Sequence, residues 1–260
     1  MTTPPAALDF LRRDTFRNLP FLKMLATYGE HCRLELEGAP GREAAMLLLP
    51  VIASAFDRAT YPKAEWVVLL AAAQPADAAP LLDRLPPRCG LVFKIAAPFA
   101  DIVRAAQPIR RVTAYVSYTW PAARATAPDS RVTVSRTTDL LGRKLRAAMP
   151  KTLEDVLPYF DSGDARLFTI AEGDAPVAGC LTFPNFEDIH EIGVLYTMPG
   201  FRHRGYARGL AATAAHDLRT RNLVARFQAA EDNASSRAVA TAAGFVEFLT
   251  LEHWVSDRSA

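Results

Sequence analysis

The sequence predicts an α/β (α+β) fold for this chain of 260 residues. Short apolar and β-branched runs alternate with segments whose apolar residues recur at helical spacing. Half of the residues are hydrophobic and 22% are charged, which is typical of a globular protein with a substantial core. Residues 121–130 contain two prolines and few large apolar side chains, and predict a linker. We therefore expect an N-terminal α/β domain over 1–120 and a second domain over 131–260.

The N-terminal half begins with two helical patterns, at 7–17 and 20–28. Pro20 divides them, because proline is well tolerated at the start of a helix. Strands are then predicted at 32–37, 45–52, 65–72, 90–95 and 112–120, and helices at 77–84 and 98–106. The pattern leaves the pairing of these strands open.

The C-terminal half begins with a strand at 131–136, followed by helices at 138–147 and 152–160, the second capped by Thr152. Strands at 165–171 and 176–183 alternate well enough to form a hairpin around Gly173 and Asp174. The remaining predicted elements are a strand at 189–197, a helix at 204–219, a strand at 222–229, a helix at 233–243 and a strand at 245–254.

Composition excludes several classes of function. The net charge of +2 and the absence of a long Lys/Arg run argue against a nucleic-acid partner. The cysteines Cys32, Cys89 and Cys180 are odd in number and widely spaced, and neither they nor the five histidines show metal-ligand spacing. The N-terminus lacks the apolar core of a signal peptide, and no apolar stretch could span a membrane. We expect a cytoplasmic protein with reduced thiols, no metal and no membrane partner.

The segment from Glu191 to Ala207, EIGVLYTMPGFRHRGYA, is the most informative part of the chain. A strand ends at Pro199 and Gly200, and a basic loop then opens an amphipathic helix. Free N–H groups and the dipole at a helix N-terminus favour an anion. Gly205 and Ala207 leave room for phosphate oxygens to approach the backbone. The segment therefore predicts a pyrophosphate site.

The pattern Arg-x-x-Gly-x-Ala over Arg202–Ala207 resembles the acyl-CoA-binding loop of the GCN5-related N-acetyltransferases, the GNAT family. Asn233-Ala234-Ser235-Ser236, followed by Gly244-Phe245, resembles a second element of this family. The predicted order of elements after residue 131 is similar to the acetyltransferase (GNAT) fold, a mixed sheet flanked by helices. By its element order, the N-terminal half resembles the degenerate acetyltransferase-like half of two-domain members such as glycine N-acyltransferase.

The resemblance implies an N-acetyltransferase that transfers an acetyl group from acetyl-CoA (coenzyme A) to a primary amine. The amine would attack the thioester directly in a ternary complex, without a metal. A small molecule or an amino acid is the favoured acceptor. A protein acceptor and a non-catalytic module that binds or senses acyl-CoA remain alternatives, and a homodimer is left open.

The same resemblance assigns roles to particular residues. Glu191 matches the glutamate base of members that acetylate histones, with Glu187 and His190 as alternatives. The backbone N–H of Leu195 would stabilise the charge that develops on the thioester oxygen. The residues expected to bind the cofactor are Val194, Leu195, Tyr196, Thr197, Arg202, His203, Arg204, Gly205, Tyr206, Ala207, Arg208, Asn233 and Ser236. Arg208 or Arg237 is a candidate for the cofactor's 3′-phosphate.

One position departs from the family pattern. Many members carry a tyrosine seven residues after the motif asparagine, where it acts as general acid on the leaving thiolate. This chain has Ala240 there, and Tyr196, Tyr206 and Ser236 are the alternative acids.

A dinucleotide oxidoreductase is disfavoured, because the glycines around Gly205 miss the required spacing by one residue. No Gly-Lys-Ser/Thr is present for a nucleoside triphosphatase.

Overall fold

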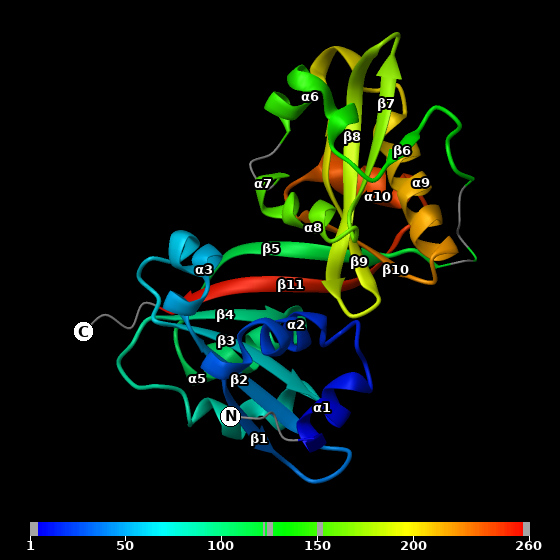
Figure 1. Cartoon of the computed structure of the whole chain (residues 1–260). Coiled ribbons are helices and arrows are strands. Elements are labelled where there is room, and N and C mark those ends of the chain that lie inside the picture. Colours follow the sequence, from blue (N-terminus) through cyan, green and yellow to red (C-terminus); the bar gives the residue numbers. More distant parts are fainter. Residues whose placement is uncertain (1–4, 122, 124–126, 150–152, 257–260) are drawn as a thin grey trace. The chain divides into compact units, whose positions relative to one another are not determined.

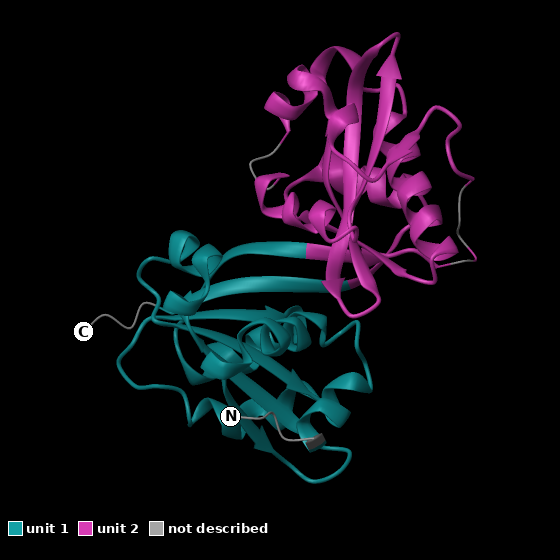
Figure 2. Ribbon diagram, in the orientation of Figure 1, with its two compact units in different colours: residues 1–115, 249–260 teal, residues 116–248 magenta. Residues whose placement is uncertain are grey.

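The computed structural model describes residues 5–121, 123, 127–149 and 153–256 (Figure 1). The predicted cap Thr152 and residues 122 and 124–126 of the predicted linker lie outside this part of the chain. The chain divides into two compact units, residues 1–115 with 249–260 and residues 116–248 (Figure 2).

This division differs from the predicted one at the last strand. Residues 131–260 were expected to form one domain, but residues 249–256 of β11 (Val246–Ser256) belong to the first unit. There they pair antiparallel with β4 (Leu91–Ala96), from Leu251 opposite Ala96 to Ser256 opposite Leu91. A strand's partner depends on long-range contacts, so local periodicity could place the strand but not its domain.

The first unit contains a mixed sheet in the order β1-β2-β3-β4-β11-β5. Its other strands are β1 (Arg33–Glu37), β2 (Ala44–Pro50), β3 (Trp66–Ala72) and the first part of β5 (Arg110–Thr119). Its helices are α1 (Pro5–Arg12), α2 (Leu19–Tyr28), α3 (Ala55–Thr60), α4 (Ala79–Leu82) and α5 (Ala100–Ala106). Strands β3 and β4 pair in parallel, while β1, β2 and β3 pair antiparallel. α3 was not predicted, because six residues are too few for a helical period to be visible.

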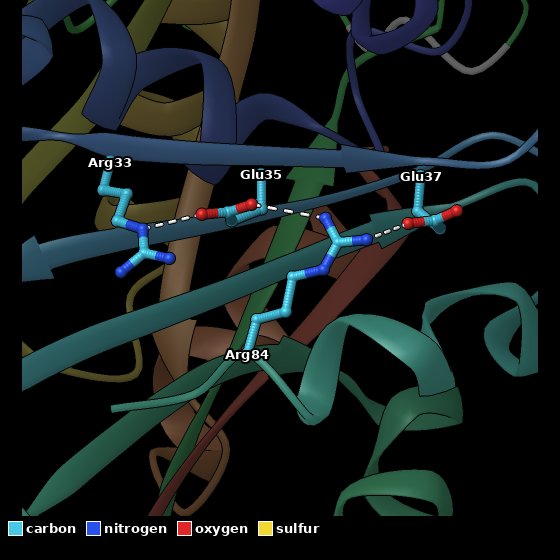
Figure 3. Close-up of polar contacts among 4 residues, drawn as sticks. All are labelled: Arg33, Glu35, Glu37 and Arg84. Atoms are coloured by element: carbon cyan, nitrogen blue, oxygen red, sulfur yellow. Dashed lines mark hydrogen bonds and ion pairs between the residues drawn. The ribbon is translucent and has the colours of Figure 1, made fainter. Parts of the chain in front are cut away.

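Strand β1 lies at the edge of this sheet and carries charged side chains (Figure 3). Arg33 Nε donates to Glu35 Oε1 at 2.6 Å. Arg84, just after α4, forms ion pairs with Glu35 and Glu37. Charges along an edge strand hinder its pairing with another chain, and ion pairs this exposed contribute little to stability.

A buried polar cluster lies inside the first unit. Lys94 Nζ is 2.6 Å from Asp57 Oδ1, and both side chains are almost completely buried. The Tyr61 hydroxyl is hydrogen-bonded to His253 Nδ1. Burial, and secondly the nearby Lys94 ammonium, lower the pKa of His253 from 6.5 to about 3. His253 is therefore neutral in the folded protein at neutral pH.

This neutral histidine predicts loss of stability in acid. Below about pH 6.5 the unfolded chain protonates His253, whereas the folded chain does so only near pH 3. The free energy of unfolding should therefore fall as the pH is lowered from about 6.5 to about 3. His253 contributes at most about 1.4 kcal/mol per pH unit to this fall. His253→Gln, which keeps an acceptor for Tyr61, should flatten that part of the curve in urea unfolding at a series of pH values. Equal slopes for both proteins would contradict the prediction.

The second unit contains the sheet β5-β10-β9-β8-β7-β6. Its strands after β5 are β6 (Thr133–Ser135), β7 (Arg166–Glu172), β8 (Ala175–Phe186), β9 (Ile189–Thr197) and β10 (Val224–Ala230). Its helices are α6 (Gly142–Ala148), α7 (Leu153–Val156), α8 (Pro158–Asp161), α9 (Tyr206–Thr220) and α10 (Ala234–Ala242). Apolar residues of α9 and α10 share one buried cluster with the sheet, and those of α6 and α7 share another. The mixed sheet flanked by helices confirms the predicted fold class.

The end of α10 at Ala242 lies within one residue of the predicted end at 243. Gly244 has a φ of +92°, the left-handed conformation that glycine adopts most easily. Its N–H donates to the Thr241 carbonyl at 3.1 Å, and the Phe245 N–H donates to the Ala240 carbonyl at 3.0 Å. This hydrogen-bond pair is a Schellman motif, so Gly244-Phe245 ends the helix and begins the last strand.

Candidate functional site

Two parallel strands of the second unit separate in the middle of the sheet. β10 pairs with β9 from Val224 opposite Ile189 to Phe227 opposite Ile192. Beyond these pairs β9 continues to Thr197 and β10 continues to Ala230, but the two strands no longer pair with each other. The sheet therefore has a split between the two strands.

A β-bulge lies on β9 directly after the pairing ends. On its other side, β9 places Gly193 opposite Leu181 and Tyr196 opposite Gly179, so one residue of β8 faces two of β9. Val194, in the bulge, has a φ of +54°. The registers thus leave Val194 and Leu195 without a partner residue on either neighbouring strand. Bulges of this kind commonly lie next to active sites.

The loop between β9 and α9 has a strained backbone. His203 and Gly205 have φ values of +64° and +76°, and Gly205 is the N-cap of α9. The first backbone N–H after Arg202 to find a backbone acceptor, within the described residues, is that of Gly209, which donates to the Gly205 carbonyl at 3.0 Å. The N–H groups of residues 203–208 therefore have no acceptor in the described structure. Six consecutive free donors at the start of a helix form an anion nest.

A groove of about 680 Å³ joins this loop to residues 195–197 of β9 and to α10. All of the predicted cofactor-binding residues line it except two, Val194 and Arg204. Val194 packs instead with the apolar cluster of α6 and α7. Arg204 forms an ion pair with Glu172 at 3.5 Å, so its guanidinium is directed elsewhere.

The groove also has a wall formed by residues that were not predicted to bind the cofactor. Its additional lining residues are Phe201, Ser235, Ala238, Val239 and Ala242. The four on α10 recur at the spacing of one helix face, so periodicity combined with the motif residue Ser236 could have identified them. Phe201 gave no such signal, because its place depends on the short 3₁₀ turn Pro199–Phe201.

The positive charges of the groove come mainly from two arginines. Arg202 Nε donates to the Thr197 carbonyl at 3.2 Å, and its guanidinium lies over the Tyr196 ring. Arg208 lines the groove and makes no hydrogen bond or ion pair within the described residues. Arg208 is thus available to an anionic ligand. Arg237 lines a separate groove, where it donates to Tyr118 and to the Glu231 carbonyl.

Asn233 lies both at the start of a helix and in the wall of the groove. Its Oδ1 accepts from the Ser236 N–H at 3.0 Å, which makes it the N-cap of α10. The same side chain lines the groove together with Ser236. The geometry is therefore compatible with Asn233 both as a helix cap and as a cofactor-binding residue.

Glu191 lies on the opposite face of the sheet from α9. Ile192 belongs to the apolar cluster of α9, and neighbouring side chains of a strand alternate between faces. Glu191 is nearly buried and forms an ion pair with Arg226 on β10. Asn185 Nδ2 donates to the same oxygen, Oε2, at 3.0 Å. No local pattern in the sequence points to Arg226, because only the β9–β10 register brings it beside Glu191.

The alternative bases are less well placed. His190 is buried on the other side of β9 from Glu191, and burial lowers the pKa of its imidazole. Glu187 lies exposed in the turn between β8 and β9. Neither residue lines the groove, and neither does Glu191.

The alternative acids are also distinguished by their surroundings. Ala240 is completely buried and does not line the groove. The Tyr206 hydroxyl is hydrogen-bonded to Glu172. Tyr196 and Ser236 line the groove.

Within the described residues, no group of three His, Cys, Asp or Glu side chains could hold a metal, and no helix is both long and apolar enough to cross a bilayer.

Comparison with known proteins connects this site with a family. Residues 136–245 match the model of the Acetyltransferase (GNAT) family. A search of curated proteins gives no match.

Solved structures share the fold along most of the chain. A GNAT-family acetyltransferase from Colwellia psychrerythraea is 11% identical, with a TM-score of 0.59 over 94% of this chain and 97% of the other. A Drosophila protein is 16% identical, with a TM-score of 0.57 over 99% and 98%. A GCN5-related N-acetyltransferase from Kribbella flavida is 13% identical, with a TM-score of 0.54 over 93% and 96%. Residues 136–245 are therefore similar to the acetyltransferase (GNAT) family, and the solved structures show that the chain shares their fold.

Proposed function

We propose that this protein is an N-acetyltransferase that transfers an acetyl group from acetyl-CoA to a primary amine of a small molecule or an amino acid. The observation that carries the proposal is the continuity of the groove. It runs from six free N–H groups at the start of α9 to residues 195–197, the part of β9 that is no longer paired with β10. A ligand with an anionic group at one end and an extended polar arm would fit both parts.

In this proposal the pyrophosphate of acetyl-CoA binds the N–H groups of residues 203–208, assisted by Arg202 and Arg208. The pantetheine arm enters the split and pairs with the free edge of β9, as a peptide does in strand addition. Leu195 and Tyr196 supply that edge. Asn233 and Ser236 contact the arm from α10.

The thioester would then lie near the bulge of β9. The N–H of Leu195, which has no partner residue on either neighbouring strand, stabilises the negative charge on the carbonyl oxygen. The amine nitrogen forms a bond to the carbonyl carbon, the carbon–sulfur bond breaks, and coenzyme A leaves as the thiolate. Glu191 accepts the proton of the amine.

The magnitudes decide how severe the loss of a base should be. Holding both reactants together can contribute about 7–11 kcal/mol to lowering the barrier. A general base contributes roughly 10²–10⁴-fold in rate, which is the smaller effect. The enzyme should therefore keep measurable activity without its base, and without a tyrosine at position 240.

Glu191→Gln tests the base. Turnover should fall by roughly 10²-fold or more, because the amide cannot take the proton, while the dissociation constant of acetyl-CoA changes little. Thiol release with a panel of amines measures turnover, and calorimetry measures binding. Unchanged turnover across the pH range would remove Glu191 from this role.

A second candidate is a non-catalytic module that binds acyl-CoA. It is favoured by Ala240, which places a buried methyl group where many relatives have a general acid. Tight acetyl-CoA binding without thiol release for any amine in the panel would support this candidate. A protein acceptor would instead show as release with lysine-containing peptides only.

A further inference from the structure

We propose that Arg226 is a positioning residue that fixes the carboxylate of Glu191 for catalysis. The inference rests on the proposed acetyltransferase function and adds a second polar residue behind the base. Its starting point is the register of the split strands: Arg226 lies opposite Glu191, one pair before β9 and β10 separate. Both residues therefore lie next to the point where the two strands separate, although neither lines the groove itself.

The two side chains form a buried ion pair. Arg226 Nη1 donates to Glu191 Oε2, and only 7% and 11% of the respective side chains are exposed. Two charges this deep are costly to desolvate, so the pair must be well hydrogen-bonded to persist. Removing one partner would leave the other as an uncompensated buried charge.

Arg226 is itself held from the far side. Its Nη2 donates to Ser117 Oγ on β5 at 2.9 Å, and Ser117 is fully buried. Gln228 Nε2 donates to the same Oγ at 3.2 Å. The guanidinium is thus clamped between two strands, which leaves it little freedom to rotate.

The clamp determines which oxygen of Glu191 is available. Arg226 and Asn185 both donate to Oε2, and no partner for Oε1 occurs within the described residues. Oε1 is therefore the oxygen free to accept a proton from the amine. A catalytic group must be held within about 0.5 Å of its productive position, and a network of this kind supplies that restraint.

The test compares Arg226→Met and Arg226→Lys with Glu191→Gln. We expect Arg226→Met to lower kcat by roughly 10- to 100-fold, less than Glu191→Gln does, with the dissociation constant of acetyl-CoA within about twofold of the wild type. Arg226→Lys should recover part of this loss, since it keeps one charged donor. Because both residues act on the same proton transfer, Arg226→Met/Glu191→Gln should be no slower than Glu191→Gln alone.

Stability is controlled separately, since Arg226→Met leaves a buried carboxylate. Assays are run below the melting temperature of each variant, and the double variant, which removes both charges, should be the better folded of the two. Arg166→Met is the matched control: it removes the arginine of the part-buried Arg166–Asp217 pair, and Arg166 does not line the groove. It should cost stability and leave kcat unchanged.

The outcomes separate this inference from the proposed function. If the wild type releases thiol but the Arg226 variants keep wild-type kcat, or lose it additively with Glu191→Gln, the positioning role is wrong and the acetyltransferase remains. If the wild type binds acetyl-CoA and releases no thiol with any amine, both proposals are wrong. If Arg226→Met mainly weakens acetyl-CoA binding, Arg226 belongs to the cofactor site instead.

Discussion

Arg202→Ala combined with Gly205→Glu should abolish binding of acetyl-CoA while the protein stays folded. Arg202 contributes a charged contact at the groove, and the new carboxylate would stand at the N-terminus of α9, where the anion is expected. Hydrogen bonds to charged groups are worth about 1.5–3 kcal/mol each, so losing one and adding repulsion should weaken binding at least about 100-fold. Calorimetric titration with acetyl-CoA measures the change.

Backbone strain needs its own control in this experiment. Gly205 has a φ of +76°, and a Cβ there would meet only Arg208 Nη2 at 3.9 Å, so space is not the obstacle. Any other residue pays about 1–2 kcal/mol for the left-handed conformation, and asparagine tolerates it best. Gly205→Asn should therefore lower stability slightly and retain most of the affinity. Normal affinity in the double variant would refute the phosphate loop.

Lys94→Met should be strongly destabilising, although Lys94 lies in the other unit and outside the groove. It removes the partner of Asp57, whose side chain is completely buried, and leaves that carboxylate unpaired. Breaking a buried pair in this way typically costs about 3–5 kcal/mol. Urea unfolding followed by circular dichroism measures the loss.

Two further variants identify the cause. Lys94→Met combined with Asp57→Leu removes both charges and should recover most of the lost stability, because no unpaired group remains. Arg84→Ala breaks the pairs with Glu35 and Glu37, which are more exposed (Figure 3), and should cost under about 1 kcal/mol. If all three variants lose equal stability, burial is not what makes the Lys94–Asp57 pair important.

The candidate site was predictable where it depends on local chemistry. The small residues Gly205 and Ala207, the cap Asn233 and the helix end at Gly244 act through their own backbone neighbourhood. The positions predicted for these residues therefore agree with the structure. The contacts of the arginines were harder to predict, because a long side chain can reach several different partners. Arg202 and Arg208 line the groove, whereas Arg204 turns to Glu172 and Arg237 to a second groove.

The amino-acid sequence alone thus determined the order of strands and helices apart from α3, the basic loop that opens α9, and the resemblance of the second half to the acetyltransferase (GNAT) family. These features follow from periodicity, capping and turn chemistry over a few residues. Only the tertiary structure determined that β11 completes the first unit, that β9 and β10 separate after Ile192, and that Arg226 pairs with Glu191. Each of these depends on strand register, and register is fixed by contacts between residues far apart in the chain.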